Sequence, residues 1–199
     1  MAGEVTHWVL LIYTVPPEPS RMRAAVWRDL KRHGAVYLRD GVCALPDLPG
    51  RPKARLGLEE IAAKVTGFGG MATLVTGGKV PGPRAASLAA ELRAARDAEY
   101  ADLALEAARF LGLLRRDRDH RELDARSLDA LAGDLVKLRA WAAQITARDF
   151  LGSPGADEAM RAVERCAAEV ALLALKTKRA AAAKATPHAV SRVARVAPR

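Results

Sequence analysis

The hydrophobic pattern of the chain begins with a continuous apolar run and continues with helical spacing. Residues 8–15 are apolar, aromatic or β-branched at every position, which is typical of a strand buried on both faces in the interior of a sheet. Residues 20–33 then place apolar side chains on one helical stripe, formed by Met22, Val26 and Leu30. Ser20 is a favourable N-cap and Gly34 a favourable left-handed stop, so we predict a helix between them.

Two short apolar segments flank the dipeptide Asp40-Gly41. An Asp-Gly pair favours the positive φ angles of a type I′ turn, which connects two antiparallel strands tightly. The pattern therefore predicts a β-hairpin made of residues 35–39 and 42–45.

A second helix and a last strand complete the first half of the chain. Residues 58–68 keep apolar side chains at helical spacing, and residues 71–76 form a short apolar segment after two glycines. The order strand, helix, hairpin, helix, strand is typical of a ferredoxin-like βαββαβ domain, which we assign to residues 1–80.

The second half of the chain has helical spacing only. A linker rich in glycine and proline at residues 77–83 precedes a long helix, which we expect to break or bend near Gly112. A further helix at residues 127–148 has a heptad seam, whose members are Leu128, Leu131, Leu135, Leu138, Ala142 and Ile145. A third helix is expected after Gly155.

These helices predict an α-helical hairpin or a three-helix bundle over residues 81–178. Residues 179–199 are rich in alanine and basic side chains, and we expect this tail to be disordered. The predicted fold class is therefore α+β, with a ferredoxin-like domain followed by the helical region.

Charge changes this picture mainly at the C-terminus. The formal net charge is +9, and seven of the nine excess positive charges lie in residues 176–199. The preceding part of the chain is nearly balanced, so the high net charge does not by itself indicate a nucleic-acid-binding fold.

The sequence predicts a cytoplasmic protein without a membrane-spanning segment. No apolar run approaches the ~20 residues that a membrane span needs, and the N-terminus lacks the pattern of a secretory signal. Cys43 and Cys166 are far apart in the sequence, and the four histidines have no ligand spacing. We therefore expect no disulfide framework, no metal site and no cofactor.

Three stretches together resemble the N-terminal region of the chromate-resistance regulator family, whose members are associated with chromate efflux pumps. They are Trp8-Val-Leu-Leu-Ile-Tyr-Thr-Val-Pro-Pro-Glu-Pro-Ser20, then Ala25 to Val42 with Leu45-Pro46, and finally Arg96-Asp-Ala-Glu-Tyr-Ala-Asp102 with Ala147-Arg-Asp-Phe-Leu-Gly152. The resemblance covers nearly everything from residue 8 to about residue 175. It implies a bacterial protein that senses or regulates chromate resistance by transcription regulation.

The chain departs from that family and from a more distant one. Longer members continue into a C-terminal domain for which we expect no room here. The first half also resembles the ferredoxin-like domain of phenylacetate-type repressors and of CRISPR-associated small nucleases. No winged-helix segment precedes Trp8, so we expect the usual DNA-reading module of those repressors to be missing.

Basic residues on the first predicted helix are the best candidates for binding an anion. Residues 20–39 hold six basic side chains against the single acid Asp29, and these candidates are Arg21, Arg23, Arg28, Lys31, Arg32 and Arg39. Arginine grips tetrahedral oxyanions through paired donors, so chromate, another oxyanion or the phosphates of DNA could bind there. Tail contacts are expected from Lys184, Arg192, Arg195 and Arg199. A solvated helix face is the structural alternative.

Other chemistry-bearing residues have a structural alternative that we favour. Asp40 suits a turn better than a metal site, and Trp27 suits half-buried packing better than base stacking. The two cysteines suit buried packing, although chromate is an oxidant and redox sensing stays an alternative. Arg148-Asp149-Phe150 is expected to end a helix and dock Phe150.

The sequence therefore predicts a non-enzymatic regulator or sensor of chromate resistance that binds an oxyanion, DNA or both through basic surfaces. We expect it to form a homo-oligomer. One alternative is a structural or oligomerisation module whose coiled-coil helices pair subunits without binding DNA. The other is a metal-dependent nuclease, which is disfavoured because the first predicted strand ends at Thr14-Val15 without a carboxylate.

Overall fold

A computed structural model of the protein describes residues 5, 7–50, 52–120 and 125–185. This part of the chain contains one four-stranded antiparallel sheet and five helices, so the predicted α+β class is confirmed. In chain order the elements are β1 (Trp8–Thr14), α1 (Ser20–His33), β2 (Val36–Arg39), β3 (Val42–Pro46), α2 (Lys53–Gly67), β4 (Met71–Gly78), α3 (Gly82–His120), α4 (Ala125–Ala147) and α5 (Ala156–Ala185).

The first strand lies inside the sheet, as its apolar run predicts. The strand order is β2-β3-β1-β4, and every neighbouring pair is antiparallel. In the register, Leu11 lies between Cys43 of β3 and Leu74 of β4. Pairing on both edges satisfies the backbone polar groups of β1, which is what allows so apolar a strand to be buried.

The hairpin of β2 and β3 forms, but its turn differs from the type I′ turn that Asp40-Gly41 predicts. A type I′ turn needs positive φ at both central residues, whereas only Gly41, at φ 71°, has it. The pairing register shifts between Tyr37 and Arg39. Such a bulge increases the right-handed twist of the strands, which a type I′ turn would otherwise have to match. Gly41 remains necessary because a Cβ there would lie 2.6 Å from the carbonyl oxygen of Tyr13.

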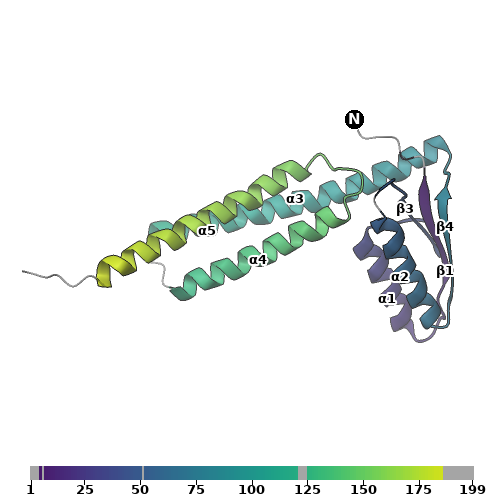
Figure 1. The fold of residues 1–199 in the computed structure, drawn as a ribbon, viewed down its shortest axis with the longest axis horizontal. Helices are drawn as coiled ribbons and strands as arrows, with labels where there is room; N and C mark the ends of the chain where they lie inside the picture. The colour runs from purple at the N-terminus through teal and green to yellow at the C-terminus, as the bar shows by residue number, and fades with distance from the viewer. Residues whose placement is uncertain (1–4, 6, 51, 121–124, 186–199) are drawn as a thin grey trace, which may run out of the picture.

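Helices cover the two faces of the sheet unequally. Figure 1 shows α1 and α2 side by side on one face, where Val9 and Leu11 pack with Leu30 and Leu58. On the other face the N-terminal part of α3 covers Trp8 through a cluster formed by Val5, Trp8, Ala44, Leu88 and Leu92.

Burial of β1 on both faces is therefore only partly correct. Ile12, further along the strand, is 46% exposed, and Met71 and Val75 on the neighbouring β4 are also exposed. Since α3 leaves the sheet after its first turns, it covers the Trp8 end of this face and not the Ile12 end (Figure 1).

Helix α1 begins one residue earlier than its sequence predicts. Pro19 occupies the N-cap position without a side-chain cap, and its carbonyl oxygen accepts a hydrogen bond from the Met22 amide at 3.0 Å. Ser20 is therefore the first helical residue, not the N-cap. The stop at Gly34 is confirmed, since Gly34 has φ 75° and its amide donates to the Lys31 carbonyl oxygen at 3.0 Å.

The last three helices pack together into an elongated bundle (Figure 1). Its core includes the buried seam residues of α4, from Leu131 to Ile145, against α3 and α5. Helix α3 passes through Gly112 without the expected break, because its neighbours Phe110 and Leu114 are buried and outweigh the roughly 1 kcal/mol propensity cost of one glycine. Helix α5 continues to Ala185, beyond the Lys178 at which we expected the helical region to end.

Among the described residues, no helix is both long enough and apolar enough to cross a bilayer.

Candidate anion-binding surface

All six candidate residues of the first anion-binding prediction are exposed: Arg21, Arg23, Arg28, Lys31, Arg32 and Arg39. Five of them lie on α1, which buries Val26 and Leu30 on its opposite side. Arg21, Arg28 and Arg32 are spaced by seven and four residues, so helical periodicity places them on one line along the exposed side. The helix therefore presents a row of cations to solvent.

Asp29 neutralises part of this positive charge by forming ion pairs. Its carboxylate is buried and contacts Arg32 Nη2 at 2.5 Å and Lys64 Nζ of α2 at 2.7 Å. Both oxygens are used in these ion pairs, so Arg32 is held against its own helix. Arg21, Arg23 and Arg28 form no ion pair with any described residue, and they are the cations most open to a ligand.

Trp27 lies next to this row, about 100° round the helix axis from Arg28. Its side chain is 52% exposed, and Lys31 Nζ lies 5.5 Å from the centre of its ring. A cation over the ring is attracted by the negative face of the aromatic system. Trp27 is therefore exposed and belongs to no buried cluster of the described residues, so the half-buried packing that its sequence context favours is wrong, and its ring is open to solvent.

The remaining basic candidates are not brought to the same place. Arg39 ends β2 at the edge of the sheet, and within the described ranges β2 makes no close backbone approach to α1. Lys184 lies in the helical backbone of α5. Arg192, Arg195 and Arg199 lie outside the described residues.

A second cluster of charges joins the two halves of the molecule. Glu99 of α3 accepts hydrogen bonds through different oxygens from two arginines, Arg96 Nη2 at 3.0 Å and Arg148 Nη2 at 2.8 Å. Arg148 follows α4 directly, and its Nε also donates to Glu99 at 3.1 Å. We call Arg96, Glu99 and Arg148 the joint.

The joint touches α1 through Gly34. A Cβ at Gly34 would lie 2.8 Å from Arg96 Nη1 and 3.3 Å from the Arg148 Cβ, so a side chain there would displace the Arg96 guanidinium and crowd Arg148. Arg96 is 7% exposed, and its Nε and Nη1 find no hydrogen-bond partner among the residues that the structure describes. Burial lowers the pKa of Arg96, and the nearby Glu99 carboxylate opposes that shift.

The segment after Arg148 fastens the joint to the sheet domain. Phe150 packs on the cluster between sheet and α1–α2, and Leu151 packs on the cluster around Trp8. Asp149 accepts a hydrogen bond from the Ser153 amide at 2.9 Å and so shapes this turn. The predicted end of a helix and docking of Phe150 are confirmed.

The motifs around Arg96 and Arg148 are recognisable in the sequence, but their proximity in the fold is not. Arg96 lies on the apolar stripe of α3, four residues after Leu92 and four before Tyr100, both of which are buried. A cation on an apolar stripe indicates a buried ion pair, because a buried arginine requires a partner of opposite charge. Which residue supplies that partner could not be read locally, since Glu99 and Arg148 are 49 positions apart.

Asp47 and Asp40, the acidic residues near the sheet, have structural roles. Asp47 Oδ2 accepts a hydrogen bond from the Gly77 amide at 3.2 Å and ties down the end of β4. Asp40 is exposed in the hairpin turn, as the turn prediction requires. Within the described ranges, no three of the His, Cys, Asp and Glu side chains are grouped so that they could hold a metal ion.

Both cysteines are fully buried and free. Burial raises the pKa of the Cys43 thiol to about 12 and also raises the pKa of Cys166, whose Sγ donates to the Ala107 carbonyl oxygen at 3.3 Å. Because the thiolate is the reactive form, a raised pKa lowers reactivity at neutral pH.

We expect the native chain to resist thiol reagents at pH 8. With a pKa of about 12, only about one Cys43 in ten thousand is a thiolate at that pH. Absorbance with a disulfide-exchange reagent should show almost no release from the native protein and two thiols per chain in guanidinium. Labelling should increase as the pH is raised towards 12. Rapid labelling of a native thiol at pH 8 would contradict buried packing and favour redox sensing.

Comparison with known proteins gives two matches in sequence. The family model described as "Protein ChrB, N-terminal" matches residues 23–184. The curated "Protein ChrB" of Cupriavidus metallidurans is 47% identical over 45 residues, which are 23% of this chain and 14% of that protein. No solved structure matches the chain.

Proposed function

The chain belongs to the family of the ChrB N-terminal region, and from this membership we propose that it is a chromate-resistance regulator that binds DNA phosphates through α1. The observation that carries the binding proposal is the row of exposed cations on α1. Arg21, Arg23 and Arg28 are open and unpaired among the described residues, and Trp27 and Lys31 lie beside them.

The spacing of these cations favours a polyanion over a single small oxyanion. Arg21 and Arg28 are seven residues apart, which is about 10 Å along a helix. A lone tetrahedral anion is held by donors that converge on one point. Phosphates repeat along a nucleic-acid strand and can meet cations that are spread along a helix. A free oxyanion such as chromate is the second candidate ligand, supported by the family.

We also propose that residues 8–78 have the ferredoxin-like arrangement and that their role is binding, not catalysis. The central position of β1 between β3 and β4 supports the arrangement. For the role, Asp47 is engaged with the backbone of β4, and Asp40 lies in a turn. The metal-dependent nuclease alternative has no carboxylate at the end of β1, where Thr14 stands.

Binding through α1 should depend steeply on salt. Each phosphate that a cation neutralises releases condensed counterions, at a slope of about −0.9 per contact in log affinity against log salt. Replacing Arg21, Arg28 and Lys31 by alanine should therefore reduce the slope by about 2–3. Fluorescence anisotropy with a labelled duplex, repeated over a series of salt concentrations, measures this change.

A charge-matched variant distinguishes an effect of the position of these cations from an effect of the net charge of the chain. Arg126, Arg139 and Arg161 are exposed on α4 and α5, and replacing these three by alanine removes the same charge. We expect that variant to keep the slope nearly unchanged. Equal losses in both variants would contradict a specific role for α1. Truncation after Ala185 should reduce the slope further, because it removes Arg192, Arg195 and Arg199.

Competition with chromate and sulfate tests the second candidate ligand. If either ion at millimolar concentration displaces the duplex at constant ionic strength, the surface binds free oxyanions as well. If neither does, the surface is selective for the polyanion.

A further inference from the structure

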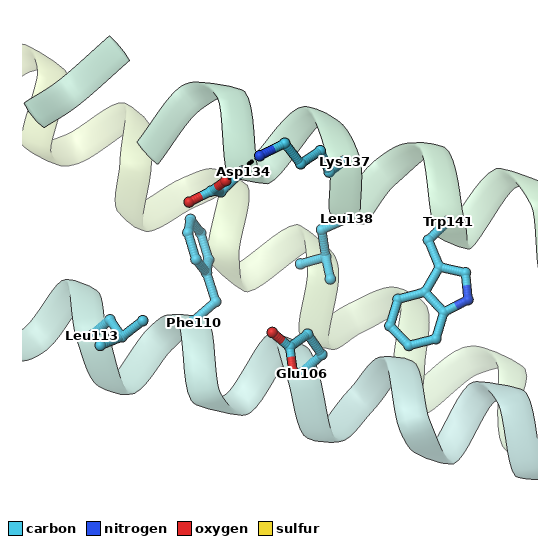
Figure 2. A pocket seen from close by; sticks show the side chains of 7 residues that line it. All are labelled: Glu106, Phe110, Leu113, Asp134, Lys137, Leu138 and Trp141. Carbon is cyan, nitrogen blue, oxygen red and sulfur yellow. Dashed lines mark hydrogen bonds and ion pairs between the residues drawn. The ribbon is translucent and has the colours of Figure 1, made fainter. Parts of the chain in front are cut away.

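A groove runs between α3 and α4 on the side of the bundle away from α5. Its volume is about 450 Å³, and its apolar lining is formed by Phe110, Leu113, Leu138 and Trp141. Figure 2 shows Trp141 and Leu138 projecting from α4 towards α3, while Phe110 projects from α3 towards α4. Leu113 is 48% exposed, so the groove offers apolar surface to solvent.

The groove exists because the three helices do not pack equally. Helices α3 and α4 each approach α5 more extensively than they approach each other. The side chains of α3 and α4 therefore fill the space towards α5 and leave their outer side open. In a four-helix bundle, this is the side on which further helices pack.

Acids and bases both lie at the rim of the groove or directly beside it. On α3, Glu106 is paired with Arg109 at 3.2 Å, and on α4, Asp134 is paired with Lys137 at 2.8 Å. Each helix thus carries an acid and a base one turn apart. In a two-fold interface the same surface meets itself, so acids and bases must both be present to pair across it.

The size of the surface also fits a dimer. Helix α4 has 23 residues, which is about 35 Å of helix. A face of that length and two helices wide covers roughly 700 Å² on each partner, close to the ~800 Å² per partner of a stable interface. Leu113 and Trp141 supply the partly exposed apolar side chains of this face, and aromatic side chains of this kind are enriched among the residues that dominate binding energy.

We propose that this groove is the docking site for a second copy of the chain, with α3 and α4 of each copy packed against those of the other. The interface is isologous, with Leu113 and Trp141 as its apolar contacts and the buried Phe110 and Leu138 as the floor of the groove. This surface is distinct from α1 and does not depend on the proposed binding of DNA.

The mass of the chain in solution tests the proposal. Sedimentation equilibrium at about 50 µM should give a dimer for the full chain, because specific interfaces of standard size have Kd values of about 1 µM or lower. Leu113→Glu should give a monomer with unchanged helicity, because Leu113 is exposed in the monomer and the glutamate would be buried only in the dimer. Val136→Glu is the matched control: Val136 is 65% exposed on α4 outside the groove, and the variant should remain a dimer. A monomeric full chain, or a dimer that survives Leu113→Glu, would overturn the proposal.

Cross-linking tests the same surface without a substitution that weakens the dimer. The two native cysteines are buried, so Leu113→Cys introduces an accessible thiol at the groove. A short bis-maleimide should join two copies through residue 113 and should join far fewer through a Val136→Cys control. Equal yields would contradict the assigned surface.

A third variant, truncated after Ala185, distinguishes another occupant. If the full chain is a monomer and the truncated chain is a dimer, residues 186–199 occupy the groove and the proposal is wrong. If both are dimers, a second copy is the occupant.

Discussion

Replacing Glu99 by glutamine should lower the free energy of unfolding by about 3 kcal/mol, because it leaves two arginines without their shared carboxylate. Glu99 accepts hydrogen bonds from Arg96 at 3.0 Å and from Arg148 at 2.8 Å, and both arginine side chains are largely buried. The variant keeps the shape of the side chain and removes its charge, so two like charges remain close together in poorly solvated surroundings. Denaturant unfolding followed by circular dichroism measures the loss.

An exposed ion pair on the same helix provides the control. Glu91 of α3 pairs with Arg84 at 3.1 Å, and both side chains are nearly half exposed. Glu91→Gln should therefore cost only about 0–0.5 kcal/mol. If Glu99→Gln is no more destabilising than Glu91→Gln, the joint does not hold the two halves together.

A double replacement of Leu131 and Leu135 by aspartate should unfold the helical bundle at room temperature. Both leucines are buried between α4 and its neighbours. Each substitution removes an apolar side chain, at a cost of about 2–5 kcal/mol, and also places a carboxylate in an apolar core. The expected sum exceeds the 5–15 kcal/mol stability of a typical domain or consumes most of it. Thermal melting at 222 nm should lose the transition of the bundle.

The matched control moves the same change by one residue along α4. Ala132 and Val136 are exposed and have the same spacing of four. Replacing both by aspartate should shift the melting temperature by only a few degrees. A variant at Leu131 and Leu135 that keeps its melting temperature would show that the seam is not the core of the bundle.

Local sequence was sufficient for features that depend on periodicity and on single-residue backbone preference. The apolar run at β1 predicted an interior strand, because so continuous an apolar segment favours a strand that is paired on both edges. Gly34 predicted the end of α1 from its tolerance of positive φ. The seam of α4 predicted burial of Leu131 and Leu135 from helical spacing alone.

The same local rules were insufficient where the backbone of adjoining residues or the packing of another element decides the outcome. Ser20 did not become the N-cap, because the Pro19 carbonyl already accepts the first helical hydrogen bond. The hairpin turn followed a register shift in its strands, not its Asp-Gly preference. Ile12 stayed exposed because α3 leaves the sheet before covering it.

The sequence by itself determined which side chains of α1 are cationic and which of its positions face the core. Whether those cations are open was decided by tertiary structure, since Asp29 pairs with Lys64 of another helix and holds Arg32 beside it. The joint and the groove likewise required the fold. Glu99 meets Arg148 only because α4 returns antiparallel to α3, and Phe110 lies opposite Leu138 and Trp141 for the same reason. Periodicity specifies the buried side of each helix, but long-range packing alone specifies what that side meets.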